Sequence, residues 1–302
     1  MEWLTGYAVF HWIATWANPF GDVFFRVVTD LGYPTFYYVA VAPLFWVVDR
    51  RRAAALFLLV LAGAYVNTYA KLLVNTPRPD PTLARVLDMR PYQSHSNSFP
   101  SGHAQGAVVF WSYLAWWVGR RWFTALALVF IGLISFSRLY LAVHFPIDIL
   151  GGLVLGVFLL PAIRPFERWA NADCVAPRWA KAAIIVGTLV IAVTGDAALA
   201  MISGSVVGFL AGGYWLPQRP LEVATPRQAT AVVIVGLGLQ LGFAAVLGLV
   251  PPSRQVALYA LVALLWVFAL WAYPSLVNAV WLRPALASVT NRPHGVTNGG
   301  TS

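Results

Sequence analysis

Long apolar runs constrain the fold of this chain more than any other feature of its sequence. Nine of them fall at about residues 33–49, 53–74, 102–118, 123–140, 147–163, 180–195, 197–216, 228–250 and 256–282. Each is long enough, or nearly so, for a helix to cross a bilayer. Of the 302 residues, 60% are hydrophobic and only 10% are charged, which excludes a soluble globular domain. The sequence therefore predicts an all-α, polytopic helical membrane protein with about nine transmembrane spans.

Two of these spans depend on one interpretation. The apolar block at 180–216 is about twice as long as a single span requires, and we divide it at the turn formed by Thr194, Gly195 and Asp196. The division is needed because the loop charges fit one orientation only when the count is nine.

The basic residues in the loops predict that orientation. With nine spans, the basic loops share one side, which we assign to the cytoplasm: residues 49–52, 119–121, 164–168, 178–181, 219–227 and 283. The N-terminus, the loop at 75–101 and the turns at 141–146, 194–196 and 251–254 then lie on the extracytoplasmic side, and the C-terminus is cytoplasmic. This pattern explains the net charge of +9 without a nucleic acid as partner.

We expect three parts along the chain: an interfacial helix and a core of five spans in residues 1–175, an extension of four spans in 176–285, and a disordered tail in 286–302. The first segment lacks a basic start and a cleavage site, so we expect it to remain as a Trp-rich interfacial helix. The single cysteine, Cys174, excludes an intrachain disulfide and a cysteine-based zinc site.

A first polar motif, KLLVNTPRP at residues 71–79, combines Lys71 at the end of the second span with Arg78 just beyond it. Two prolines stop the helix, so Arg78 is held in a stiff extended turn at the interface. Taken alone, the two residues are better explained as snorkelling cations that anchor a helix end.

A second motif, SFPSGHAQG at residues 98–106, begins the third span. Ser101 can cap the helix, Gly102 allows a ligand to approach the backbone, and the first turn presents unpaired N–H groups. These features predict an anion site, and His103 would face the same anion. The alternative is an ordinary capped helix start with a histidine that has no role.

A third motif, SRLYLAVHFPID at residues 137–148, contains Arg138, His144 and Asp148. The spacing of four residues places His144 and Asp148 on one helical face. An aspartate in this position can hold one ring nitrogen and leave the other free as a nucleophile or base. A helix-start aspartate beside a buried histidine is the alternative. Ionisable groups this close to a bilayer usually have a function.

The three motifs fall on one side of the membrane in the predicted topology. Two arginines, one lysine, a helix N-terminus and two histidines then converge, and this set suits a doubly charged tetrahedral oxyanion. A phosphoryl group is the obvious ligand. Asp80 and Asp88 in the loop have no partner cluster, so we predict no metal site.

In their order and spacing the motifs resemble those of type 2 phosphatidic acid phosphatases. The resemblance covers about residues 20–165 and leaves the four C-terminal spans outside. With that extension the chain is similar to the glucose-6-phosphatase and sphingosine-phosphate phosphatase branches. The resemblance implies that His144 attacks phosphorus and forms a phosphohistidine, Asp148 orients it, and His103 protonates the leaving oxygen and then activates water. Lys71, Arg78, Ser101, Gly102 and Arg138 would bind the phosphate oxygens, with no cofactor and no metal.

The resemblance implies a phosphatase acting on a lipid phosphate or lipid pyrophosphate embedded in the bilayer. Two alternatives remain at this point: a phosphotransferase that passes the group to a lipid or sugar acceptor, and an inactive relative that binds or flips lipids. The related haloperoxidases are soluble, unlike this chain. The composition favours a bacterial inner membrane with the site facing the periplasm. The substrate and the oligomeric state stay open.

Overall fold

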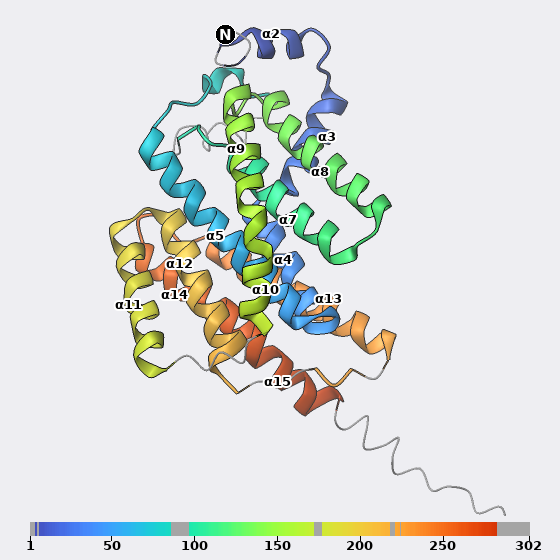
Figure 1. Cartoon of the computed structure of the whole chain (residues 1–302), viewed down its shortest axis with the longest axis vertical. Helices are drawn as coiled ribbons and strands as arrows, with labels where there is room; N and C mark the ends of the chain where they lie inside the picture. The colour runs from blue at the N-terminus through green and yellow to red at the C-terminus, as the bar shows by residue number, and fades with distance from the viewer. Residues whose placement is uncertain are drawn as a thin grey trace, which may run out of the picture.

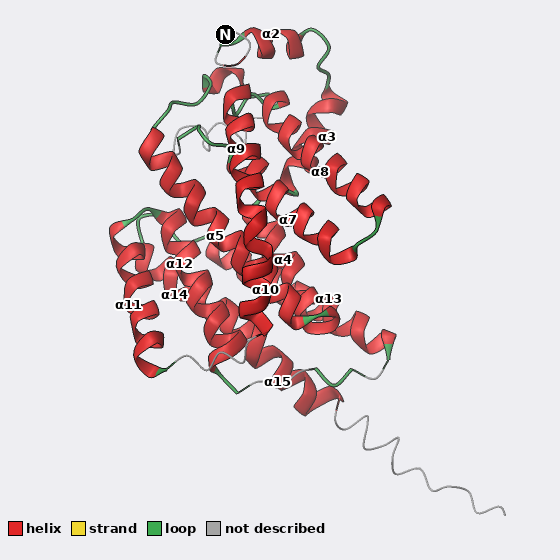
Figure 2. Ribbon diagram, viewed as in Figure 1, coloured by secondary structure: helices red, strands yellow, loops and turns green. Residues whose placement is uncertain are grey.

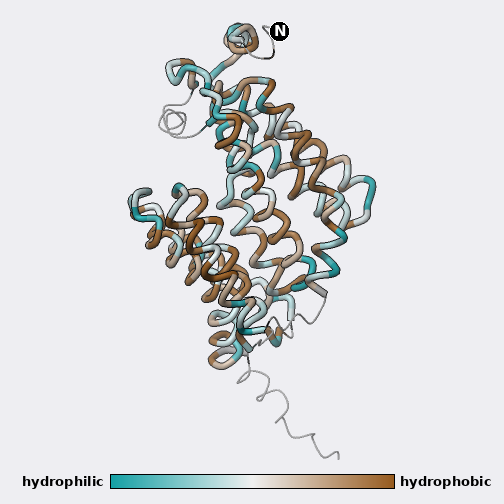
Figure 3. Tube along the Cα trace, turned by 60° about the vertical axis from the view of Figure 1, so that its left-hand side comes forward, coloured by the Kyte–Doolittle hydropathy of each residue, from teal (hydrophilic) through white to brown (hydrophobic). Residues whose placement is uncertain are grey.

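The computed structural model describes residues 4, 6–85, 97–171, 177–217, 221–223 and 225–282. In these segments the regular secondary structure is helical, with loops between the helices and no strands (Figures 1 and 2). The predicted tail at 286–302 and Cys174 lie outside the described residues. Apolar residues run along the helices, and polar residues concentrate at loops and helix ends (Figure 3). The all-α prediction is confirmed for the described segments.

The N-terminal half contains α2 (Ala8–Ala14), α3 (Pro19–Asp30), α4 (Pro34–Pro43) with a π-helical end (Leu44–Val48), α5 (Arg50–Val74), α7 (Gly102–Val118), α8 (Arg121–Tyr140), α9 (Pro146–Leu159) and α10 (Ile163–Asn171). Short 3-10 turns lie at Pro81–Leu83 and Leu160–Ala162. The C-terminal half contains α11 (Arg178–Thr194), α12 (Ala197–Leu210), α13 (Pro226–Leu247), α14 (Gln255–Val267) and α15 (Tyr273–Val277), with π-helical segments at Ala211–Trp215, Phe268–Ala272 and Asn278–Leu282.

Helices are present at all nine predicted spans, but not all of them meet the length of a span. Six are long and apolar enough to cross a membrane: Arg50–Val74, Arg121–Tyr140, Pro146–Ala170, Ala197–Trp215, Pro226–Leu247 and Gln255–Val280. A seventh results if Pro19–Asp30 and Pro34–Val48, bent by 55°, count as one. Helices α7 and α11 have 17 residues each, about 25 Å, slightly less than the hydrocarbon thickness. The count of nine and the orientation therefore stay predictions.

Helix α3 was not predicted from the apolar runs. It begins with a local signal: the side chain of Asn18 accepts a hydrogen bond from the backbone of Gly21 at 3.0 Å, and Pro19 occupies the first helical position. The helix packs against α8, and the bend between α3 and α4 passes close to α7. At Gly32 in that bend, an added Cβ would lie 2.8 Å from the His103 ring. The bend therefore forms part of the wall around the predicted site.

The two halves of the chain share one apolar core. Helix α5 supplies a continuous buried stretch from Ala53 to Leu61, and residues of α4, α7, α12 and α14 join the same cluster. Trp266 of α14 packs on Phe57 of α5, with ring centroids 4.2 Å apart. Helix α12 also packs beside α5 (Figure 1). The predicted domain boundaries stay predictions.

Candidate active site

Close packing of α9 on α7 brings the second and third motifs together. Asp148, Gly152 and Gly156 are spaced by four residues and share one face of α9. An added Cβ at Gly152 would lie 2.4 Å from the Ser101 carbonyl oxygen, and one at Gly156 would lie 2.7 Å from Val108 Cβ. These small residues allow the helix backbones to approach closely. As a result, the backbone N–H of Ser101 donates to the backbone carbonyl of Asp148 at 2.9 Å.

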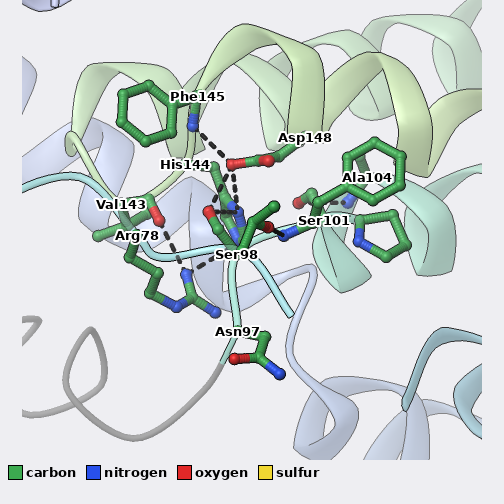
Figure 4. Close-up of polar contacts among 12 residues, drawn as sticks. Arg78, Asn97, Ser98, Ser101, Ala104, Val143, His144, Phe145 and Asp148 are labelled. Atoms are coloured by element: carbon green, nitrogen blue, oxygen red, sulfur yellow. Dashed lines mark hydrogen bonds and ion pairs between the residues drawn. The ribbon is translucent and has the colours of Figure 1, made fainter. Parts of the chain in front are cut away.

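His144 and Asp148 form a buried pair, although His144 precedes α9 and does not lie on its helical face as predicted. The Nδ1 atom of His144 lies 3.3 Å from Asp148 Oδ2, and the side chains are 1% and 2% exposed (Figure 4). The same carboxylate oxygen accepts from the Phe145 backbone N–H at 2.8 Å and from the Ser98 hydroxyl at 2.5 Å. These bonds fix the carboxylate beneath the imidazole ring.

Ser98 is a site residue that sequence reasoning missed. It lies in the second motif but received no role, because an isolated loop serine has many possible partners. Its backbone N–H donates to the Thr76 carbonyl at 2.9 Å, and the Thr76 hydroxyl accepts from Phe99 N–H at 3.0 Å. Thr76 thus ties the first motif to the second.

Arg78 lies on the other side of the His144 ring. Its Nη1 donates to the Val143 carbonyl at 2.8 Å and lies 3.1 Å from His144 Nε2 (Figure 4). A guanidinium can only donate, so Nε2 must be the acceptor, and the ring proton then lies on Nδ1, facing Asp148. The arrangement selects the tautomer whose electron pair lies on Nε2, where Arg78 donates to it.

The surroundings of His144 keep its ring neutral. The residue lies in the turn between α8 and α9, and its burial lowers the pKa well below the ordinary histidine value of about 6.5. The positive charges of Arg78, Lys71 and Arg138 lower the pKa further. A neutral imidazole is the form that can act as a nucleophile.

Lys71 is held by the backbone that enters the second motif. Its Nζ donates to the carbonyls of Asn97 at 2.6 Å and Ser98 at 3.0 Å, and the Asn97 side chain donates back to the Lys71 carbonyl at 2.9 Å. Helix α5 ends at Asn75, which adopts a left-handed conformation with φ 49°. That end places Lys71 in the last turn of α5, beside the motif.

Ser101 and His103 occupy the start of α7. Ser101 caps the helix by accepting from Ala104 N–H at 3.5 Å, and it is fully buried. His103 is 4% exposed, and its ring packs edge-on against Tyr33 with centroids 4.6 Å apart. Its Nε2 has no hydrogen-bond partner among the described residues. A buried polar atom of this kind calls for a ligand or a catalytic role.

Arg138 reaches the site from the end of α8 and is fully buried. Its Nη1 donates to the Thr29 hydroxyl of α3 at 2.5 Å, a partner that the sequence did not indicate. Arg138, Arg78 and Lys71 all interact electrostatically with both histidines. The structure therefore brings the charged and histidine residues of the three motifs into one cluster.

A cavity of about 1050 Å³ opens from this cluster. Lys71, Arg78, Gly102 and His103 line its charged end. Asp80 is exposed, whereas Asp88 lies outside the described residues. Within the described part of the chain, no group of three or more histidine, cysteine, aspartate or glutamate side chains could hold a metal ion.

The fold and the site together define a helical membrane protein with a buried His–Asp pair inside a cationic cluster. Residues 52–172 match the PAP2 superfamily. The chain therefore carries a PAP2 superfamily domain, as the resemblance of its motifs predicts.

Individual relatives agree with this assignment. The chain is 29% identical over 152 residues to lipid phosphate phosphatase delta of Arabidopsis thaliana, covering 46% of this chain and 36% of that protein. It is 28% identical over 236 residues to sphingosine-1-phosphate phosphatase 2 of Mus musculus, covering 75% of this chain and 59% of that protein. The chain thus spans well under two thirds of these relatives.

A similar solved structure is the crystal structure of a transmembrane PAP2-type phosphatidylglycerolphosphate phosphatase from Bacillus subtilis. It has 23% sequence identity and a TM-score of 0.45, and the match covers 55% of this chain and 85% of that chain.

Proposed function

We propose that this protein is an integral membrane phosphatase that hydrolyses a lipid phosphate monoester or pyrophosphate through a phosphohistidine, without a metal ion. One observation carries the proposal: His144 is buried and neutral, its Nδ1 faces Asp148, and its Nε2 electron pair faces the cationic cluster. This is the arrangement of an activated nucleophile with an orienting carboxylate. The lipid phosphatase relatives support the same reaction class.

The first half-reaction forms the phosphoenzyme. His144 Nε2 attacks phosphorus while the bond between phosphorus and the lipid oxygen breaks, and His103 donates a proton to the departing oxygen. Asp148 balances the charge of the phosphorylated imidazole. Lys71 and Arg78 bind the phosphate oxygens as negative charge spreads over them in the transition state.

Arg138 and the start of α7 complete the oxyanion site. Arg138 adds a third cation, and the backbone N–H of Gly102 lies at the positive end of the helix dipole, whereas the N–H of Ser101 already donates to the Asp148 carbonyl. Because Arg78 donates to His144 Nε2 in the structure, its guanidinium must turn toward the phosphate to expose the nucleophile. Substrate binding therefore frees the atom that attacks it.

The second half-reaction restores the enzyme. His103, now neutral, removes a proton from water, and the resulting oxygen nucleophile attacks phosphorus. The bond between phosphorus and Nε2 breaks, inorganic phosphate leaves, and His103 keeps the proton for the next cycle. Atoms and charges balance over the two steps, and neither needs a group from outside the described cluster except water.

The test uses purified protein in EDTA and a panel of phosphatidate, phosphatidylglycerol phosphate, polyprenyl pyrophosphate and sphingoid phosphate. We expect phosphate release, trapping of a radiolabelled phosphoenzyme by rapid quenching, and loss of both in His144→Ala. His11→Ala is the matched control, because His11 is exposed on α2. Phosphate release by His144→Ala, or dependence on added Mg²⁺, would refute the scheme, and transfer of label to an acceptor would replace hydrolysis by phosphotransfer.

We also propose that the site faces the extracytoplasmic side of the membrane, as the loop charges predict. Helix α5 carries arginines at its first three positions and Lys71 in its last turn, and its 25 residues separate these ends by about 37 Å. The arginine-rich end and the catalytic cluster therefore lie on opposite sides of a bilayer. The bacterial inner membrane stays a prediction.

Cysteine labelling tests the orientation. In a Cys174→Ser background, Thr82→Cys places an exposed thiol in the loop after α5, and Arg120→Cys places one between α7 and α8. Position 120 is preferable to Gly119, whose φ of 64° disfavours a side chain. In intact cells, a membrane-impermeant maleimide should label position 82, whereas position 120 should react only after lysis. The reverse pattern would overturn the orientation.

A further inference from the structure

The cavity continues from the cationic cluster toward the C-terminal extension. Four helices line it. The lining includes Tyr33, Pro34, Tyr37 and Tyr38 from α4 and the residue before it, Val60 to Leu72 at helical spacing from α5, Gly102 to Val109 from α7, and Asp196, Ala198, Met201 and Ile202 from α12 and its N-cap. Along α5 the lining extends from Lys71 to Val60, about 16 Å. The cavity is therefore deep enough for more than a phosphate.

The polar groups next to the cluster are largely satisfied by one another. Asn67 donates to Gln105 Oε1 at 2.7 Å, and Gln105 donates to the Gly63 carbonyl at 2.8 Å. Tyr38 Oη accepts from the Ser205 hydroxyl at 3.2 Å. These groups build the wall and do not depend on a ligand.

Tyr37 differs from them. Its side chain is 3% exposed and lines the cavity, but its hydroxyl has no hydrogen-bond partner among the described residues. The ring stacks on Phe110 with centroids 4.8 Å apart and lies against Gly106, where an added Cβ would be 3.1 Å from Tyr37 Oη. Packing thus holds the hydroxyl in place, and a buried hydroxyl without a partner is costly.

The Tyr37 hydroxyl lies close to the expected position of a bound phosphate. Gly106 follows His103 by three residues on α7, which corresponds to about 4.5 Å along the helix axis. A ligand whose phosphate contacts His103 and Arg78 would place its next few atoms beside Tyr37 Oη. A hydroxyl or ester oxygen in that part of the ligand would satisfy the orphaned group.

The far end of the cavity is apolar. Met201 and Ile202 of α12 and Val60 and Leu61 of α5 line it. Here the extension supplies a wall that the PAP2 domain at 52–172 does not contain. An alkyl chain that begins at the phosphate would end against these side chains.

We infer that the substrate is a lipid phosphate with a hydrogen-bonding oxygen within a few atoms of its phosphate, that Tyr37 binds this oxygen, and that Met201 and Ile202 of α12 contact the tail. The inference rests on the proposed function and narrows its substrate class, because prenyl monophosphates lack such an oxygen beyond the phosphate itself. Tyr37 is then a specificity residue, and the extension takes part in substrate selection.

The first test compares two single-chain alkyl phosphonates of equal length, one with a hydroxyl on the second carbon from phosphorus and one without. Binding to the wild-type protein is measured by thermal shift and calorimetry, so no turnover is required. We expect Tyr37→Phe to weaken binding of the hydroxylated probe about tenfold, in the range for one neutral hydrogen bond, and to leave the plain probe unchanged. Tyr69→Phe is the matched control and should alter neither affinity, because Tyr69 is exposed on α5 and does not line the cavity. Equal effects of Tyr37→Phe on both probes would overturn the assignment.

The second test measures hydrolysis of a lysophosphatidate and of the small soluble substrate para-nitrophenyl phosphate. Met201→Trp should raise KM for the lipid at least fivefold and leave kcat/KM for the soluble substrate unchanged. Val193→Trp, at an exposed position of α11, controls for added bulk. Equal loss on both substrates would show that Met201 acts through folding only. If the wild type hydrolysed neither substrate, the proposed function would fail, whereas the phosphonate result would still decide the inference.

Discussion

Gly152 allows the catalytic pair and the anion-binding turn to meet, so Gly152→Ala should damage catalysis without changing any catalytic residue. The added Cβ would lie 2.4 Å from the carbonyl oxygen of Ser101, 3.1 Å from Ala104 Cβ and 3.3 Å from the backbone nitrogen of Gln105. Ordinary contacts of a Cβ begin near 3.4 Å. Because the nearest atom belongs to the backbone, no rotamer change can relieve the overlap. Helix α9 must move away from α7 by about 1 Å.

That displacement determines the expected loss. Asp148 lies one turn before Gly152 on the same face, so the shift moves the carboxylate and His144 relative to Ser98 and Ser101. A misplacement of about 1 Å at a reacting centre costs about 10²-fold in rate. Overpacking of this kind also lowers the free energy of unfolding by about 1–3 kcal/mol.

The assay is the single-turnover rate of phosphoenzyme formation, measured together with thermal unfolding in detergent. Gly132→Ala is the control, because an added Cβ there has no atom within 4 Å. We expect Gly152→Ala to lose about 10²-fold and Gly132→Ala to keep the wild-type rate. A rate for Gly152→Ala within twofold of the wild type would show that the α7–α9 contact does not position the site.

Three further outcomes are expected. Asp148→Asn should lower kcat about 10³- to 10⁴-fold with little change in KM, because the amide cannot stabilise the charged, phosphorylated ring as the carboxylate does; an unchanged kcat would remove Asp148 from that role. Thr29→Val should lower the free energy of unfolding by about 1–3 kcal/mol, since it removes an acceptor of the buried Arg138; chemical denaturation measures this, and wild-type stability would contradict it. Because the pKa of His144 is lowered in the folded protein, the unfolded chain binds the additional proton below pH about 6.5, so the unfolding temperature should fall as the pH is lowered through that region. In His144→Gln the fall should be shallower, and parallel pH curves would refute this origin.

Local sequence signals account for what could be predicted. The contact between His144 and Asp148 is local, because only four residues separate them at the start of α9, and the cap at Ser101 follows from the residues that start a helix. The apolar runs located helices for the same reason, because length and composition are properties of the segment itself. Each of these features depends on residues that are close in the chain.

The parts that were missed depend on packing between distant segments. Ser98 reaches Asp148 across 50 residues, and Thr29 reaches Arg138 across 109. Nothing in a serine or threonine indicates which distant partner it will meet. Helix α3 is different, because Asn18 and Pro19 gave a local start signal; a search for spans passed over it since the helix has only 12 residues. The contribution of α12 to the cavity also follows from packing.

The charge balance of the cluster explains why its cations bind carbonyl groups in the structure. Lys71 interacts electrostatically with Arg78, Arg138 and Asp148, so three cations share the surroundings of one carboxylate. Buried charge that is only partly neutralised is costly. Lys71 donates to the carbonyls of Asn97 and Ser98, and Arg78 donates to that of Val143.

Neutral carbonyls are weaker partners for these cations than a doubly charged phosphate. A phosphate that enters the cluster therefore gains the binding energy of donors already directed to nearly the required positions. Arg78 connects this exchange to the chemistry, because one of its nitrogens contacts His144 Nε2. In the proposed mechanism, the guanidinium turns to a phosphate oxygen and thereby releases the electron pair that attacks phosphorus. The same mechanism predicts that a ligand without a dianionic head group leaves Arg78 on His144 Nε2, so that His144 stays covered.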